Sequence, residues 1–210
     1  MLRVLIADDH DVVRKGLILI LEKSFPGIDV EEAADGRKAL ALMEKGSYAL
    51  VLLDISMPGR GGLEVLKEVK RLRPGVPVLI LSMHPEEEYA VRAFRAGASG
   101  YLTKDRAADE LVQAVRTVLA GRRYMSASLT EMLVRELESN GAGPRHNALS
   151  DRELQVMRML ASGKTVTEIA DELSLSVKTI STYRSRILEK LQVRNNAELA
   201  RYAFENRLVN

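Results

Sequence analysis

Short apolar runs alternate, over the first 121 residues, with segments in which apolar residues recur at helical spacing. The runs are rich in β-branched residues and cover residues 2–7, 28–33, 49–53, 76–81 and 100–102. Helical spacing predicts helices at about 11–24, 36–45, 62–72, 86–96 and 106–120. Strands that alternate with helices are typical of right-handed crossovers and a parallel sheet. We therefore predict an α/β domain with a doubly wound, five-stranded parallel sheet.

The pattern changes after Gly121. One helix is predicted at about 127–137, and a stretch rich in Gly, Pro and Asn, SNGAGPRHN, follows it as the end of a linker. From Leu149 onward no apolar run predicts a strand, and helical spacing predicts four helices at about 150–161, 165–172, 177–191 and 196–206. We predict three parts: a first domain at 1–121, a linker with a helix at 122–148, and a small all-α domain at 149–210.

Composition limits the classes of protein that remain. The chain has no cysteine, which excludes disulfides, thiolate metal sites and a cysteine nucleophile. It has no apolar run near the ~18 residues of a membrane span and no leader-like start, so we expect a cytoplasmic protein without a membrane partner. Residues 149–210 hold ten Lys+Arg and eight Asp+Glu, an excess too small to indicate nucleic-acid binding by itself.

Polar side chains follow four of the five predicted strands. Asp8 and Asp9 follow the first, Asp54 the third and Ser82 the fourth, and Lys104 comes just after the fifth. Ligands of an open parallel sheet bind outside the carboxyl ends of its strands. We therefore expect three carboxylates, one hydroxyl and one ammonium group to meet at one edge of the domain.

These groups together indicate phosphoryl chemistry. Clustered carboxylates repel one another unless a cation joins them, and an oxygen site with few protein ligands suits Mg²⁺. Asp54 is the candidate nucleophile, because a carboxylate can accept a phosphoryl group to form an acyl phosphate. Ser82 could donate a hydrogen bond to that group, and Lys104 could neutralise its charge. Each residue alone is more often a turn former, a helix cap or a solvated side chain, so the prediction depends on the joint pattern.

Residues 1–121 resemble the receiver domain of two-component response regulators, which has a flavodoxin-like fold. The matching features are the pair Asp8 and Asp9, Asp54 at the start of D-x-x-M-P-G, Gly62 after the acceptor loop, Ser82 at the hydroxyl position and Lys104 at the lysine position. The resemblance implies that a histidine kinase phosphorylates Asp54. It also implies Mg²⁺ held by Asp8, Asp9, Asp54 and a backbone carbonyl near Ser56.

The same resemblance assigns a switch to three residues. Tyr101 stands at the family's switch aromatic, three residues before Lys104. Phosphorylation is expected to draw Ser82 and Lys104 inward, and Tyr101 then follows into the space vacated. Without the family match, Tyr101 would be read as core packing in a short edge strand. His10 is expected only to line the rim of the site.

The segment TVTEIADELSLSVKTI predicts a helix, a tight turn near Ser174 and a second helix, which is a helix-turn-helix pattern. At about 100° per residue, the second helix has a core stripe of Val177, Ile180, Ile187, Leu188 and Leu191. Polar and basic residues lie on the opposite face or beside it. A short basic amphipathic helix is also compatible with a merely solvated face.

Residues 149–210 resemble the LuxR-type helix-turn-helix, the output domain of the NarL/FixJ subfamily of response regulators. This resemblance implies base or groove-edge contacts, and neighbouring backbone contacts, from Lys178, Thr179, Ser181, Thr182, Tyr183, Ser185 and Arg186. Lys164, Thr165 and, less clearly, Arg184 could also contact the DNA backbone. It further implies a homodimer, through the helix near 196–204, on double-stranded DNA with two half-sites. Phosphorylation is then expected to unmask the recognition helix and regulate transcription.

Other functions stay open at this point. Asp9 and Asp11 have the D-x-D spacing of haloacid-dehalogenase-like phosphotransferases, which would leave Asp54 unexplained. A nucleotide-binding domain would need a glycine-rich loop that does not follow the first strand. The helices could bind protein instead of DNA, or they could bind DNA independently of phosphorylation. We expect a phosphoryl acceptor that is not a turnover enzyme.

Overall fold

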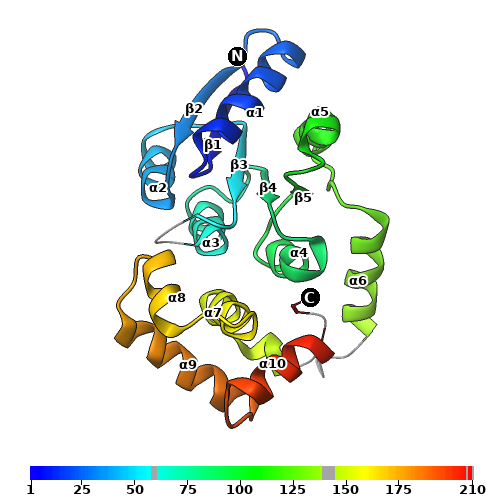
Figure 1. Ribbon diagram of the computed structural model, residues 1–210. Helices are drawn as coiled ribbons and strands as arrows, with labels where there is room; N and C mark the ends of the chain where they lie inside the picture. The colour runs from blue at the N-terminus through cyan, green and yellow to red at the C-terminus, as the bar shows by residue number, and fades with distance from the viewer. Residues whose placement is uncertain (58–60, 139–144, 207, 210) are drawn as a thin grey trace. The chain divides into compact units, whose positions relative to one another are not determined.

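The computed structural model describes residues 1–57, 61–138, 145–206 and 208–209. The chain divides into two compact units, Met1–Val134 and Arg135–Asn210. The first unit holds every strand of the described chain, and the second is helical (Figure 1). Among the described residues, no helix has both the length and the apolar character that crossing a membrane requires.

Five parallel strands form the sheet of the first unit, as predicted (Figure 1). They are β1 (Arg3–Ala7), β2 (Asp29–Ala33), β3 (Leu50–Asp54), β4 (Val78–Ser82) and β5 (Gly100–Thr103). Their order across the sheet is β2-β1-β3-β4-β5, which confirms the doubly wound architecture. Every residue of β3 and β4 is buried, because both faces of these central strands are covered.

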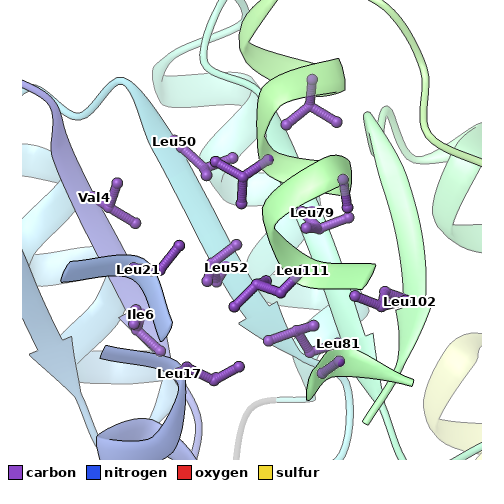
Figure 2. Packing of buried hydrophobic residues seen from close by; sticks show 14 residues of the cluster. Val4, Ile6, Leu17, Leu21, Leu50, Leu52, Leu79, Leu81, Leu102 and Leu111 are labelled. Atoms are coloured by element: carbon purple, nitrogen blue, oxygen red, sulfur yellow. The ribbon is translucent and has the colours of Figure 1, made fainter. Parts of the chain in front are cut away.

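Helices cover the sheet on both sides. They are α1 (Asp11–Ser24), α2 (Gly36–Lys45), α3 (Gly62–Leu72), α4 (Glu86–Arg95) and α5 (Ala107–Leu119). Figure 2 shows alternate strand residues such as Val4, Leu52 and Leu79 packed against Leu21 of α1 and Leu111 of α5. This alternation follows from the two-residue period of a strand. The helices α2, α3 and α4 contact one another in sequence and belong to the other face.

The register of the sheet aligns the carboxyl ends of the inner strands. Ala7 of β1 pairs with Leu53 of β3, and Asp54 pairs with Leu81 of β4. Ser82 in turn pairs with Thr103 of β5. Asp54 and Ser82 are the last residues of their strands and not the first residues of loops, one position later than predicted. The sheet backbone therefore fixes the positions of both.

The remaining helices are α6 (Ala127–Glu138), the 3-10 helix η1 (Arg145–Ala148), α7 (Asp151–Ala161), α8 (Val166–Glu172), α9 (Val177–Leu191) and α10 (Asn196–Glu205). Sequence analysis missed η1, which lies in the predicted linker; residues 139–144 of that linker lie outside the described residues. Side-chain oxygens of Ser150, Thr165, Ser176 and Asn195 cap the four C-terminal helices.

The second unit has its own small core. Helix α7 packs on both α9 and α10, and its Leu154 and Met157 are buried together with Ile180, Ile187 and Leu199. The turn between α8 and α9 falls at Ser174, whose φ of 52° lies in the left-handed region. This tight turn starts α9 at Val177, where the helix-turn-helix pattern placed it.

Candidate functional site

The predicted acidic cluster forms at the carboxyl edge of the sheet. The side chains of Asp8 and Asp54 are fully buried, and the Lys104 side chain is only 5% exposed. Lys104 Nζ lies 2.7 Å from Asp8 Oδ2 and 2.8 Å from Asp54 Oδ2. One ammonium group therefore bridges two carboxylates from different strands, which offsets their mutual repulsion.

Burial opposes the negative charge of Asp54, and neighbouring groups compensate for this effect in part. Burial raises the pKa of Asp54 above its ordinary value, and the Asp8 carboxylate adds to the rise. The Lys104 ammonium and the Ser56 backbone N–H, which donates to Asp54 Oδ1 at 3.0 Å, act in the opposite direction. Burial alone would lower the pKa of Lys104, but its ion pairs with Asp54 and Asp8 outweigh this and raise it.

Steric contacts explain why position 62 is a glycine. A Cβ at Gly62 would lie 2.1 Å from the carbonyl oxygen of Asp54, and the Gly62 N–H donates to Ile55 O at 3.0 Å. The start of α3 thus passes directly over the backbone of Asp54. Pro58 and Gly59 of the D-x-x-M-P-G motif lie outside the described residues.

Four residues could hold a cation here. Asp8, Asp9, His10 and Asp54 each offer a ligand atom, and these atoms lie within 4.8 Å of one another. Asp9 Oδ1 is buried and lacks a hydrogen-bond partner among the described residues, although His10 Nδ1 lies 3.0 Å away. The carboxylate oxygens suit a hard divalent cation. The residues present therefore fit the predicted metal site.

His10 lies nearer the cluster than expected. Its ring is 58% exposed, as a rim residue should be, but Nδ1 is 3.2 Å from Asp8 Oδ1 as well as 3.0 Å from Asp9 Oδ1. The cause is local: His10 is the N-cap residue of α1, and its backbone N–H donates to Asp8 Oδ1 at 2.8 Å. The turn into α1 therefore folds the imidazole back over the acidic pair.

Two of the three expected switch residues, Ser82 and Tyr101, are connected through His84. Ser82 is buried, and its Oγ accepts a hydrogen bond from the His84 backbone N–H at 3.0 Å. Tyr101 is only 1% exposed, and its hydroxyl donates to the His84 carbonyl at 3.0 Å. Tyr101 thus already occupies the inward position that the sequence analysis expected only after phosphorylation.

Sequence analysis missed the role of Arg14. This arginine is 8% exposed and donates from NH1 to the Asp8 carbonyl at 2.7 Å. Its other nitrogens donate to Glu32 at 2.9 Å and to Asp11 at 2.8 Å. The guanidinium group therefore fixes the backbone of the loop that begins at Asp8. The sequence did contain a signal that Arg14 is buried, because Arg14 precedes Leu17 and Leu21 on the buried stripe of α1.

The predicted DNA-contacting residues lie together on α9. Five of them, Lys178, Ser181, Thr182, Ser185 and Arg186, are exposed, whereas Thr179 and Tyr183 are partly buried at the flank. Thr182 Oγ1 donates to Lys178 O at 2.9 Å, and Ser185 Oγ donates to Ser181 O at 3.1 Å. With their protons directed to the helix backbone, these two oxygens are available as acceptors on the exposed face.

One residue of this region differs from the sequence analysis, and two basic residues make contacts that it did not predict. Val177 was expected in the core stripe but is 49% exposed, because it lies at the edge of the arc centred on Ile180, Ile187 and Leu191. Arg184 Nε donates to Asn196 Oδ1 at 2.7 Å and so ties α9 to the start of α10. Lys164 forms an ion pair with Glu172 across α8.

The fold and these two sites define a class: a transcription regulator in which a receiver precedes a DNA-binding domain. Two family models match accordingly. The response regulator receiver domain matches residues 4–116, and the bacterial regulatory proteins of the luxR family match residues 147–203. The chain belongs to the response regulators with a LuxR-type helix-turn-helix, the NarL/FixJ family.

Individual relatives agree over the full length. The chain is 38% identical to the response regulator UvrY of Escherichia coli (strain K12) over 212 residues, which cover 100% of this chain and 97% of that protein. It is also 38% identical to the response regulator GacA of Pseudomonas aeruginosa, over 100% of this chain and 98% of that one.

Solved structures of RcsB are similar in fold. RcsB from Salmonella enterica serovar Typhimurium, bound to promoter rprA in the presence of the phosphomimetic BeF₃⁻, matches with a TM-score of 0.63 and 29% identity, over 96% of this chain and 98% of that one. A structure of two RcsB dimers bound to two parallel DNAs matches with a TM-score of 0.59 and 28% identity, over 97% and 98%.

Proposed function

We propose that a histidine kinase phosphorylates Asp54 and that this modification controls dimerisation and sequence-specific DNA binding through α9. The observation that carries the proposal is the setting of Asp54. Its buried carboxylate ends a central strand, with the Ser56 N–H on one oxygen and Lys104 Nζ on the other. Phosphoryl transfer depends mainly on such positioning and charge neutralisation.

In the proposed reaction, Asp54 attacks the phosphorus of a phosphohistidine on the kinase. The N–P bond breaks as an O–P bond to the Asp54 carboxylate forms, and the electron pair stays on the imidazole, which takes up a proton. Lys104 is already 2.8 Å from Asp54 and would follow the new negative charge. Ser82 at the end of β4 would donate its hydroxyl proton to a phosphoryl oxygen.

The residues that would hold Mg²⁺ are Asp8, Asp9, Asp54 and the backbone carbonyl of Ser56. The cation, when bound, would neutralise charge on the oxygens of the transferred group. Lys104 balances two carboxylates in this structure, and the third, Asp9, leaves Oδ1 without a hydrogen bond among the described residues. That donor set supports a divalent cation.

The proposed switch operates through the loop after β4. Since Tyr101 is already buried, phosphorylation need not move its ring inward. Drawing Ser82 toward the phosphoryl group would instead shift His84, which contacts both Ser82 and the Tyr101 hydroxyl. A charge added at Asp54 thus biases a surface built from α4, β5 and α5.

DNA binding is proposed for the exposed face of α9. Lys178 and Arg186 would contact phosphates, and Ser181, Thr182 and Ser185 would reach base edges or the groove edge, with Thr179 and Tyr183 at the flank.

Phe204 on α10 is 69% exposed, which supports α10 as the homodimer contact on two half-sites. RcsB has been solved bound to a promoter and as dimers bound to DNA, which supports the same arrangement here. Such a regulator would work in the cytoplasm.

A turnover phosphotransferase is less well supported. Its D-x-D motif would require the Asp11 carboxylate as the second acid of the site. Asp11 is 57% exposed and forms ion pairs with Arg14 and Lys15 instead. We propose an acceptor that is phosphorylated and dephosphorylated without turnover of a separate substrate.

Intact-mass measurement tests the proposal. The protein is incubated with Mg²⁺ and a small acyl-phosphate donor, beside an Asp54→Asn control. Wild type is expected to gain one phosphoryl group and the variant none. Modification of both to the same extent, or of neither with this donor and with several histidine kinases, would show that Asp54 is not the acceptor.

A further inference from the structure

The chain just after α5 returns to the sheet and pairs with β5. The Tyr124 N–H donates to Ser99 O at 2.9 Å, and the Tyr101 N–H donates to Tyr124 O at 3.3 Å, which makes a parallel bridge between Tyr124 and Gly100. A Cβ at Gly100 would lie 3.0 Å from both Cβ and O of Tyr124. The absence of a side chain at Gly100 thus lets this segment approach β5.

Side chains fix the same segment to the helices on both sides of β5. The Tyr124 hydroxyl donates to Glu110 of α5 at 2.5 Å, and burial with this contact raises the pKa of Tyr124 to about 12. Arg123 NH1 donates to Ala98 O at 3.2 Å, and its guanidinium group lies over the Phe94 ring of α4. We call residues 122–129 the linker strap.

Glu86 is the contact of the strap with the first turn of α4. It is only 9% exposed, and its Oε2 accepts hydrogen bonds from Ser126 Oγ and, at 3.2 Å, from Ser128 Oγ. Ser126 Oγ also accepts from the Leu129 N–H at 3.0 Å, as an N-cap of α6 would. The carboxylate of Glu86 therefore holds the start of α6 on the receiver.

The strap is connected to the phosphorylation site by two short routes. Glu86, the first residue of α4, is four residues beyond Ser82. The loop between them contains His84, which contacts both Ser82 and Tyr101. Tyr101 also holds Tyr124 through its backbone N–H. A movement of the loop after β4 must therefore displace Glu86 from the strap or carry the strap with it.

We propose that the linker strap is a latch on the α4–β5–α5 surface, and that phosphorylation of Asp54 loosens it. Glu86, Tyr124 and Ser128 are its positioning residues. The latch rests on the proposed function, since it transmits a signal that begins at Asp54. Its consequence is that the linker helix α6 is held on the receiver while Asp54 is unmodified and is released when Ser82 moves toward the phosphoryl group.

Hydrogen exchange by mass spectrometry on the full chain tests the latch. The probe is a small acyl-phosphate donor with Mg²⁺, and intact mass confirms modification in the same sample. In wild type, peptides covering 122–130 are expected to exchange about tenfold faster after phosphorylation, because hydrogen bonds at the strap are lost. Slower or unchanged exchange in a sample shown to be phosphorylated would overturn the latch and leave the proposed function intact.

Matched variants separate the latch from general loosening. Ser128→Ala removes a hydroxyl that contacts both Glu86 and Ser126, and Glu86→Ala removes the acceptor of both serines. Each should give fast exchange at 122–130 before phosphorylation and unchanged phosphoryl uptake. Thr117→Ala removes an exposed hydroxyl on α5 that donates to Gln113 O and should behave as wild type. Slow exchange in both strap variants would contradict the latch, whereas failed phosphoryl uptake by wild type would contradict the proposed function itself.

Discussion

Buried charge at the carboxyl edge of the sheet is the chief residue-scale feature of this protein. Asp8, Asp54 and Lys104 form an ion-paired group with almost no exposure to water. Burying ions is costly, and their mutual attraction repays the cost only in part. The proposed phosphorylation of Asp54 gives this costly group a chemical role.

This cost leads to a prediction about stability. Burial raises the pKa of Asp54 above 3.8, so the folded state binds this proton more tightly than the unfolded chain does. Stability from Asp54 is then greatest at low pH and is lost as the pH rises through the raised pKa. Asp54→Asn removes a buried charge that its partners compensate only in part, so it should increase the free energy of unfolding at pH 7 by roughly 1–3 kcal/mol.

Scanning calorimetry of the receiver transition measures this difference without Mg²⁺. The advantage of Asp54→Asn should shrink toward pH 3, where wild-type Asp54 is protonated in both states. A variant that is less stable than wild type at pH 7 would show that the ion pair with Lys104 outweighs the burial of Asp54.

Sequence alone located the residues at strand ends but not the residues that support them. Asp54, Ser82 and Lys104 were predictable because strand patterns fix where their side chains must meet. Arg14 and His10 were not, because their contacts depend on how the first turn of α1 folds over Asp8. Tyr101 could be placed in the sheet, but its rotamer, and so its contact with His84, could not be read from sequence.

Among the secondary-structure elements, periodicity predicted every strand and every α-helix of the described chain. Most of the predicted ends lie within one or two residues of the observed ends. It missed η1, a single four-residue 3-10 helix too short to show a period. It also could not predict the bridge between Tyr124 and Gly100, because one residue of pairing carries no alternating pattern. Caps were predictable, since serine, threonine and asparagine mark helix starts.

One cap leads to an element-scale prediction. Glu153, in the capping box of α7, is 3% exposed; burial opposes its charge, but Lys190 of α9 and Ser150 outweigh this and lower the pKa of its carboxyl. Its stabilisation is therefore fully present above the unfolded value of 4.5 and is lost as the pH falls through the lowered pKa. Glu153→Gln should destabilise the second unit by about 1–2 kcal/mol at pH 7.

Hydrogen exchange of peptides from α7 and α9 reports this loss without interference from the receiver. Exchange should be about tenfold faster in Glu153→Gln at pH 7. Glu168→Gln is the matched control, because Glu168 fills the same place in the capping box of α8 but is exposed. Equal effects of the two substitutions would contradict a special role for the buried pair of Glu153 and Lys190.

In the whole chain, a linker whose first residues are fixed to the receiver joins the proposed phosphorylation site at Asp54 to the proposed DNA-binding surface of α9. Each unit has its own core, so each can keep its fold while the linker changes. Sequence predicted both units from their separate patterns of strands and helices. The attachment of the linker to β5 could not be predicted, because the single bridge at Tyr124 produces no repeating pattern in the sequence.

Phosphorylation of Asp54 is proposed to control DNA binding, and one titration can decide whether it does. Fluorescence anisotropy measures the affinity of the full chain, with and without an acyl-phosphate donor and Mg²⁺, for a duplex selected from a random pool by the phosphorylated protein. Phosphorylated wild type should bind at least about tenfold more tightly, or ~1.4 kcal/mol, and Asp54→Asn should not respond to the donor. Equal affinity of confirmed phosphorylated and unmodified wild type, or an equal response from Asp54→Asn, would contradict the account.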